Sequence, residues 1–190
     1  MKKYLWILAA AFLLQACSKD EEEGPYVPWR PGDDKEETID LDKATKVMIL
    51  TEQAKNRIVM IDQPTGKVAW EWTAADSGLS AAEQAWFDLP DEAKPVYNRT
   101  CVLVTASGGG VALIRIADKK AMFYAKPGGN PHSAEVLPDG NVVVASSTGN
   151  LLSVYVYNGA DSDVSRPAFT MPVHSAHNVV WDRKRGCLWT

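Results

Sequence analysis

Short apolar runs separated by turn residues follow one another along most of the chain. The runs are rich in β-branched and aromatic residues and are bounded by Gly, Pro, Asn and Asp, which is typical of strands. Several runs, such as "NVVVA" and "LLSVYV", are apolar at nearly every position, as expected for strands covered on both faces. The pattern predicts strands at Val47–Thr51, Arg57–Asp62, Lys67–Trp72, Cys101–Ala106, Val111–Ala117, Ala121–Ala125, Glu135–Leu137, Val142–Ser146, Leu151–Tyr157, Ala168–Val173, Val179–Trp181 and Cys187–Trp189.

An internal repeat groups these strands. "VLVTASGGGVALIRI" (Val102–Ile116) aligns without a gap with "VVVASSTGNLLSVYV" (Val142–Val156), and Val47–Ile61 is a weaker third copy with a longer turn. A unit of about 40–50 residues with up to four strands has the size of a propeller blade. The sequence therefore predicts an all-β fold, a β-propeller with three blades and the start of a fourth. Since complete propellers have about four to eight blades, we expect an incomplete one here, with about six to eight blades in the whole protein.

One segment, Asp76–Val96, departs from the strand pattern. It contains Ser80 and Glu83 at the spacing of a capping box, followed by residues that favour helix up to Phe87 and by Pro90, which stops a helix. We expect one short helix within a long connection between the first two blades.

The N-terminus has the pattern of a targeting segment. Lys2 and Lys3 precede the apolar run Tyr4–Ala16, which is too short to span a bilayer. "LQAC" then resembles the lipobox of bacterial lipoproteins, which implies a signal peptide over 1–16 and a lipid anchor on Cys17. An ordinary secretory signal with an unrelated Cys is the alternative.

The residues after Cys17 form an acidic and Pro-rich segment. "SKDEEEG" resembles the export signal that sends Bacteroidota lipoproteins to the outer cell surface, whereas a plain solvated spacer is the alternative. We interpret 17–44 as a tether and 45–190 as the propeller domain, with an outer-membrane location, exposed at the cell surface or facing the periplasm.

Charge and cysteines add two limits. The chain has 20 basic and 24 acidic residues, and without residues 1–16 the net charge is −6, which excludes the clustered basic surface of a nucleic-acid partner. Cys101 and Cys187 lie in strand-like runs, and either one disulfide or two buried thiols fits the sequence.

Two resemblances to known families concern the propeller. "IDQPTGKVAWEW" resembles the D-x-x-T-G-K-x-x-W segment of quinoprotein-like propellers, and we interpret it as blade packing, with no cofactor implied. "DEAKPV", "TASGGGVALIR" and "NPHSAEVLPDGNVVVASSTGN" together resemble a family of Bacteroidota propeller lipoproteins of unknown function. That resemblance implies a six-bladed propeller on a lipid anchor and assigns no catalytic residue.

The three histidines are the first candidate site. His132, His174 and His177 each precede an expected innermost strand, so they could converge at the central channel, where imidazole suits ligand contact or proton transfer. His174-x-x-His177 has no accompanying carboxylates, so no metal site is predicted. The alternative is that each ring bonds neighbouring backbone at a turn.

Further candidates lie on the connections. Glu92, Lys94 and Arg99 could bind an anionic sugar or carboxylate, and the alternative is a solvated loop or an ion pair. Asn130 joins them as a polar ligand contact. "SGGG" at Ser107–Gly110 has no following helix and is predicted to be a hairpin turn, not a phosphate site.

These residues leave three functions open. The first is a membrane-anchored propeller that binds a carbohydrate or other polar ligand or partner. The second is a lyase or hydrolase acting on acidic glycans, with His132 or His177 as the general base and Lys94 or Arg99 neutralising the carboxylate. The third is a structural protein-interaction module.

Overall fold

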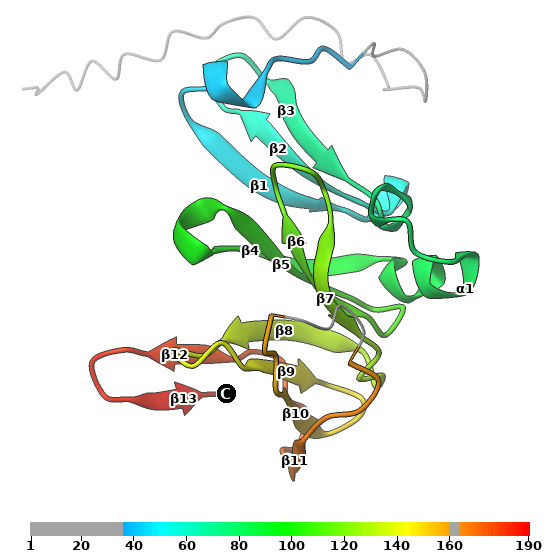
Figure 1. Ribbon diagram of the computed structural model, residues 1–190, viewed down its shortest axis with the longest axis vertical. Helices are drawn as coiled ribbons and strands as arrows, with labels where there is room; N and C mark the ends of the chain where they lie inside the picture. Colours follow the sequence, from blue (N-terminus) through cyan, green and yellow to red (C-terminus); the bar gives the residue numbers. More distant parts are fainter. Residues whose placement is uncertain (1–35, 160–163) are drawn as a thin grey trace, which may run out of the picture. The chain divides into compact units, whose positions relative to one another are not determined.

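The computed structural model of the chain describes residues 36–159 and 164–190. Residues Glu36–Thr190 form one compact unit (Figure 1), whereas the expected signal peptide, Cys17 and the acidic run lie outside the described residues. Among the described residues, no helix combines the length and the apolar character needed to cross a bilayer.

The unit consists of four antiparallel sheets, and in each the strands are neighbours in sequence order (Figure 1). Such up-and-down sheets are the blades of a propeller. The first sheet is β1 (Val47–Glu52), β2 (Arg57–Asp62) and β3 (Lys67–Trp72); the second is β4 (Pro90–Val96), β5 (Cys101–Ala106), β6 (Val111–Arg115) and β7 (Ala121–Ala125); the third is β8 (Pro131–Val136), β9 (Val142–Ser146), β10 (Leu151–Tyr155) and β11 (Phe169–Pro172); the fourth is β12 (Val180–Asp182) and β13 (Cys187–Trp189).

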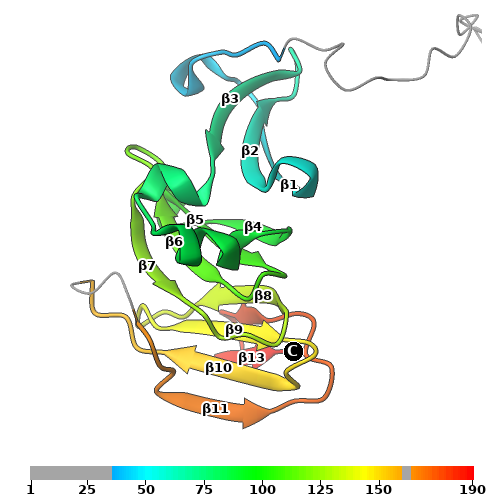
Figure 2. The same cartoon turned by 90° about the vertical axis from the view of Figure 1, so that its right-hand side faces the viewer.

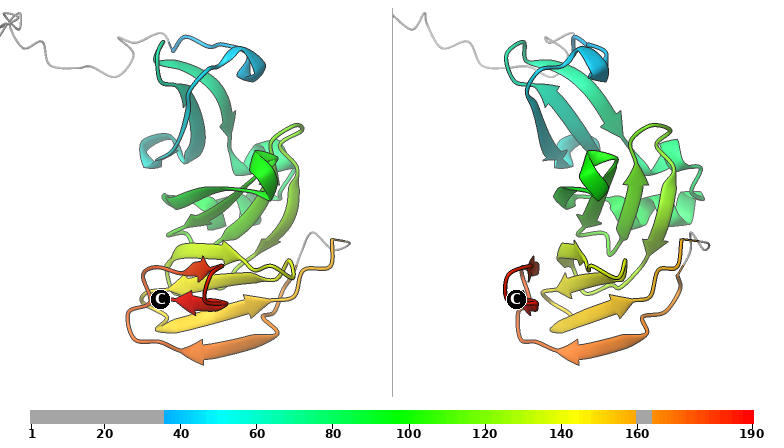
Figure 3. Two further views of the ribbon diagram at one scale, coloured as in Figure 1. Left: turned by 90° about the vertical axis from the view of Figure 1, so that its left-hand side faces the viewer. Right: turned by 60° about the vertical axis from the view of Figure 1, so that its left-hand side comes forward.

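The sheets follow one another as successive blades (Figures 2 and 3). Their first strands are in contact in turn, β1 with β4, β4 with β8, and β8 with β12, so these strands lie innermost. Within the described residues the sheets do not close into a ring. The predicted propeller fold is confirmed.

The internal repeat has a direct structural counterpart. Val102–Ile116 contains β5 and β6, and Val142–Val156 contains β9 and β10, which are the second and third strands of two successive sheets. The weaker copy, Val47–Ile61, is also strand, turn and strand, but it forms the first and second strands of its sheet.

Strands β5 and β9 pack apolar side chains on both faces, which explains their continuous apolar runs. In β5, Val102 and Val104 belong to the core between the first two sheets, whereas Cys101 and Leu103 belong to the core between the second and third. Trp72 packs in the first of these cores, as predicted for the "VAWEW" segment. Cys101 and Cys187 do not form a disulfide with each other, and both are free thiols.

The predicted helix is present but short. It comprises α1 (Ala81–Gln84) and the 3₁₀ turn η4 (Ala85–Phe87), and the capping box of Ser80 and Glu83 forms as expected. Phe87 is buried with its ring edge-on to Trp72, and Trp86 contacts Tyr124, so both rings attach the helix to the blades.

The "SGGG" turn is a hairpin, as predicted, and its glycines serve this helix. The amide of Gly110 donates a hydrogen bond of 2.8 Å to the carbonyl oxygen of Trp86. A Cβ at Gly108 would lie 2.5 Å from the carbonyl oxygen of Ala85, so only glycine permits the approach.

Several strand boundaries differ from the sequence prediction, and two of these differences affect the candidate site. Pro90–Val96 was expected to be a loop but is β4, an innermost strand, whose free inner side tolerates Pro90 and Pro95. The strand containing His132 begins at Pro131, four residues before the predicted start at Glu135, so His132 lies within β8.

The folded unit also begins earlier than Thr45. Thr38 pairs in parallel with Val68 of β3, and η1 (Leu41–Lys43) follows. The buried guanidinium of Arg57 bonds the carboxylates of Glu36, Glu52 and Glu71, and its hydrogen bond holds the pKa of Glu36 below the usual value. Residues 36–44 are therefore part of the fold and not of the tether.

Candidate ligand-binding site

The seven candidate residues occupy different levels along the innermost strands. Asn130, His132 and His177 lie where β8 begins and just before β12; Glu92 and Lys94 lie within β4; Arg99 follows the opposite end of β4. His174 is exposed, with its Nδ1 3.1 Å from Ser175 Oγ. The structure therefore divides the predicted site into separate groups.

The histidine group is held by protein partners. His132 Nε2 is 2.9 Å from the side-chain amide nitrogen of Asn130, and its Nδ1 is 3.7 Å from Asp91 Oδ1. The ring stacks on His177 with 4.8 Å between centroids, and His177 Nδ1 donates to the carbonyl oxygen of Ser175 at 2.8 Å. Both nitrogens of His132 therefore have neighbours within the protein.

Among the described residues, no histidine that could act as a general base is bonded to a cationic side chain that could neutralise a substrate carboxylate. Across residues 36–159 and 164–190, no Lys or Arg is bonded to any of the three histidines. The same residues contain no group of three His, Cys, Asp or Glu side chains placed to hold a metal ion.

Lys94 and Glu92 join the first strands of neighbouring sheets. The ammonium of Lys94 donates to Ser133 Oγ at 3.2 Å and to the carbonyl oxygens of Ala134 and Val179 at 2.9 Å each. Glu92 Oε1 is 3.2 Å from the same ammonium, and Glu92 Oε2 accepts a hydrogen bond from the Ala134 amide at 3.0 Å. Because an ammonium has three N–H groups, Lys94 has no donor left for a ligand.

Arg99 lines a hollow at the far ends of the innermost strands, which we call the strand-end hollow. Its volume is about 660 Å³, within the range of small-molecule sites. β4, β8 and β12, from three different sheets, contribute to it. The lining residues are Pro95, Val96, Tyr97, Asn98, Arg99, Glu135, Val136, Leu137, Pro138, Trp181 and Arg183.

The strand-end hollow carries unpaired positive charge. Neither Arg99 nor Arg183 has an ion-pair or hydrogen-bond partner for its guanidinium in the part of the chain that the structure describes, whereas Arg57, Arg115 and Arg185 all bond carboxylates. The one carboxylate of the lining, that of Glu135, is 3.6 Å from the Lys94 ammonium. An anion is the complementary ligand.

The backbone that carries Arg99 is unusual. Tyr97, Asn98 and Arg99 have φ values of 48°, 54° and 67°, three consecutive non-glycine residues in the left-handed region, which costs about 1–2 kcal/mol each. The hydroxyl of Thr100 donates to the carbonyl oxygen of Tyr97 at 2.7 Å and closes the turn. Tyr97 is 45% exposed, and partial burial raises the pKa of its hydroxyl, which remains a donor at neutral pH.

Sequence reasoning identified Arg99 and missed Tyr97, Trp181 and Arg183. Tyr97 and Arg183 each follow an innermost strand, as Arg99 does, and Trp181 is the middle residue of β12. Recognising that Pro90–Val96 is an inner strand would have pointed to the residues after it.

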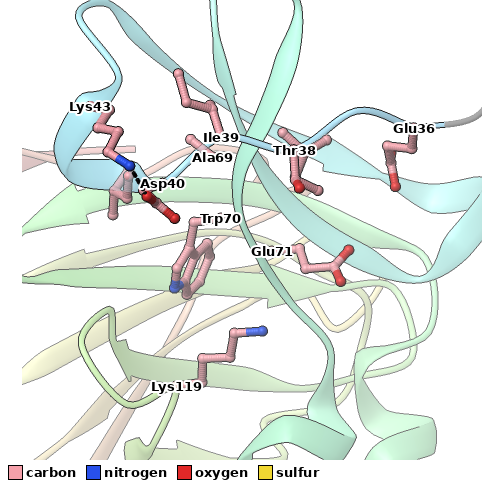
Figure 4. A pocket seen from close by; sticks show the side chains of 11 residues that line it. Glu36, Thr38, Ile39, Asp40, Lys43, Ala69, Trp70, Glu71 and Lys119 are labelled. Carbon is pink, nitrogen blue, oxygen red and sulfur yellow. Dashed lines mark hydrogen bonds and ion pairs between the residues drawn. The ribbon is translucent and has the colours of Figure 1, made fainter.

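A second hollow lies between residues 36–43 and β3, but its charges are already paired. Figure 4 shows the Trp70 ring between the Asp40–Lys43 ion pair and Lys119. Lys119 is 3.5 Å from Asp76, and Glu71 bonds Arg57. This hollow therefore offers a ligand no unpaired charge among the described residues.

A third depression, which we call the interblade groove, runs between the first two sheets. Its volume is about 820 Å³. Most of its lining is apolar. The lining residues are Leu41, Ala44, Thr45, Lys46, Val47, Ile49, Met60, Gln63, Ala93, Pro95, Arg99 and Ile116.

Comparison with solved structures supports the fold. The chain is similar to hydrazine synthase of Kuenenia stuttgartiensis, with a TM-score of 0.54, 18% identity, and 83% of this chain and 43% of that chain covered. It is also similar to the WD40 β-propeller domain of Doa1, with a TM-score of 0.51, 11% identity, and coverage of 80% and 45%. At such identities the likeness concerns the fold alone, and the chain spans less than half the length of these structures.

Sequence comparison gives a family but no activity. No curated protein matches the chain. The family model described as "Family of unknown function (DUF6528)" matches residues 1–190.

Proposed function

This chain belongs to the family of unknown function DUF6528, and from that premise we propose that it is a propeller-type binding module for an anionic polar ligand, with an acidic carbohydrate as the candidate. The propeller fold suggests a module for ligand binding or protein interaction. We propose that the ligand binds in the strand-end hollow.

One observation carries the proposal: two guanidinium groups, on segments that follow strands of different sheets, line one hollow without a carboxylate partner among the described residues. Guanidinium groups bind carboxylates in a bidentate manner, and desolvated pairs of this kind are stronger than neutral hydrogen bonds. Tyr97 and Trp181 add aromatic rings with polar edges, which suit the mixed polar and apolar faces of a sugar ring.

Enzymatic activity on acidic glycans has less support. It requires a histidine near a cationic side chain, whereas Arg99 and His132 lie at opposite ends of β4 and β8. A ligand contacting Arg99 in the hollow would therefore have no imidazole base beside it.

We expect each of Arg99→Ala and Arg183→Ala to weaken binding of methyl β-D-glucuronide about tenfold, since each removes a charge-assisted contact. NMR titration measures the affinity, with neutral methyl β-D-glucoside as the reference ligand. Arg115→Ala is the matched control, because Arg115 bonds Asp118 away from the hollow. Equal affinity for the charged and neutral sugars, or no effect of either variant, would contradict the proposal.

We further propose that Cys17 carries a lipid that holds the protein on the outer membrane, facing the cell surface. The support is the apolar run that ends in "LQAC" and the acidic residues that follow it. In this location the propeller would meet extracellular glycans.

Cys17→Ser is expected to abolish incorporation of an alkyne-labelled fatty acid, because the thiol that accepts the acyl chain is gone. In-gel fluorescence after metabolic labelling measures it. Cys187→Ser is the control and keeps the label, since Cys187 lies in β13 of the propeller. Labelling of the Cys17→Ser protein at the wild-type level would refute the lipid anchor.

A further inference from the structure

The interblade groove and the strand-end hollow share part of their walls. Pro95 and Arg99 line both, so the two depressions meet at the turn that follows β4. One side of this junction has the unpaired guanidinium groups, and the other leads between the first two sheets.

Eight of the twelve residues that line the groove are apolar, and the polar ones are Thr45, Lys46, Gln63 and Arg99. Val47 and Ile49 of β1 and Ala93 of β4 line it together with Met60 and Ile116. Val47 remains 44% exposed, so its side chain presents apolar surface to whatever occupies the groove.

The polar backbone beside the groove is satisfied within the protein. The amides of Thr45 and Lys46 donate to Asp62 Oδ1 at 3.0 and 3.4 Å, and the amide of Gln63 donates to the carbonyl oxygen of Lys46 at 2.7 Å. These amides therefore need no hydrogen-bond acceptor from a ligand. An apolar ligand group can lie in the groove without leaving them unpaired.

We propose that the ligand is an amphipathic anion, with its acidic head in the strand-end hollow and an alkyl or aryl extension in the interblade groove. This inference rests on the proposed function, because it keeps Arg99 and Arg183 as the contacts for the head. The head must be anionic because it lies beside two guanidinium groups. The extension must be apolar because it is buried against the apolar lining of the groove. The class of ligand is an acidic glycoside whose aglycone is hydrophobic.

The test compares three ligands on the full protein by calorimetry: methyl β-D-glucuronide, octyl β-D-glucuronide and octyl β-D-glucoside, each below its micelle concentration. Octyl glucuronide is expected to bind at least tenfold more tightly than methyl glucuronide, since one buried methylene alone contributes about fourfold. Octyl glucoside, which lacks the carboxylate, is expected to bind at least tenfold more weakly than octyl glucuronide.

A pair of variants locates the extension. Val47→Ser is expected to lower the affinity for octyl glucuronide by at least threefold and to leave that for methyl glucuronide unchanged. Leu50→Ser is the matched control, because Leu50 is on the same strand, is 37% exposed and does not line the groove.

The outcomes separate the two proposals. Equal binding of the methyl and octyl glucuronides would overturn the amphipathic ligand and leave the anion-binding function standing. Equal binding of octyl glucoside and octyl glucuronide would overturn the acidic head, and with it the proposed function. Failure of both glucuronides to bind would overturn both proposals.

Discussion

Phe123→Ala is expected to lower the free energy of unfolding by about 4 kcal/mol, because it opens a cavity in the core between the second and third sheets. Phe123 lies in β7 and is 0% exposed. Its ring makes T-shaped contacts with Tyr155 and Tyr157, each with 5.7 Å between centroids. The loss has three parts: the hydrophobic free energy of burying the ring, the cost of the cavity left behind, and the two aromatic contacts.

Urea unfolding followed by near-UV circular dichroism measures this loss. Phe169→Ala is the matched control: the same change on β11, where the side chain is 57% exposed, is expected to cost less than about 1 kcal/mol. Similar losses in both variants would mean that packing between blades does not stabilise this fold.

The strands and the repeat could be predicted because their cause is local. In β5 and β9 both faces of the strand are covered by neighbouring sheets, so almost every position is apolar and the run is visible in the sequence. The turn after β5 contains Gly109 and the turn after β9 contains Asn150, and φ is positive at both residues.

β4 could not be recognised in the same way. Its sequence "PDEAKPV" has two prolines and three charged residues, which is typical of a loop. The charges are tolerated because each finds a partner on another segment: Asp91 accepts from Ser107, Glu92 from the Ala134 amide, and Lys94 donates to β8. Those partners come from contacts that no local pattern reveals.

The candidate site was predictable only in part for a related reason. Arg99 stood out as a basic residue on a connection. Trp181 and Arg183 are 82 or more positions away in sequence and join it only because β8 contacts both β4 and β12. A hollow built from three sheets leaves no signal in any one of them.

Lys94 shows how such long-range partners decide stability, and Lys94→Met is expected to lower the free energy of unfolding by about 3 kcal/mol. The change keeps most of the aliphatic stem and removes the ammonium. The carbonyl oxygens of Ala134 and Val179 then lose their 2.9 Å donor, and Glu92 loses the cation 3.2 Å away. Unpaired polar groups in a partly buried site account for the loss.

Urea unfolding again measures the effect, with Lys67→Met as the matched control. Lys67 pairs with Glu37 at 2.8 Å on an exposed surface, so its loss is expected to cost less than about 1 kcal/mol. Adding Glu92→Gln to Lys94→Met removes the stranded carboxylate charge and is expected to restore part of the stability. If Lys94→Met unfolds at the wild-type urea concentration, the contacts of Lys94 do not hold β4, β8 and the segment before β12 together. Those contacts would then not be what positions Arg99 and Arg183 around the same strand-end hollow.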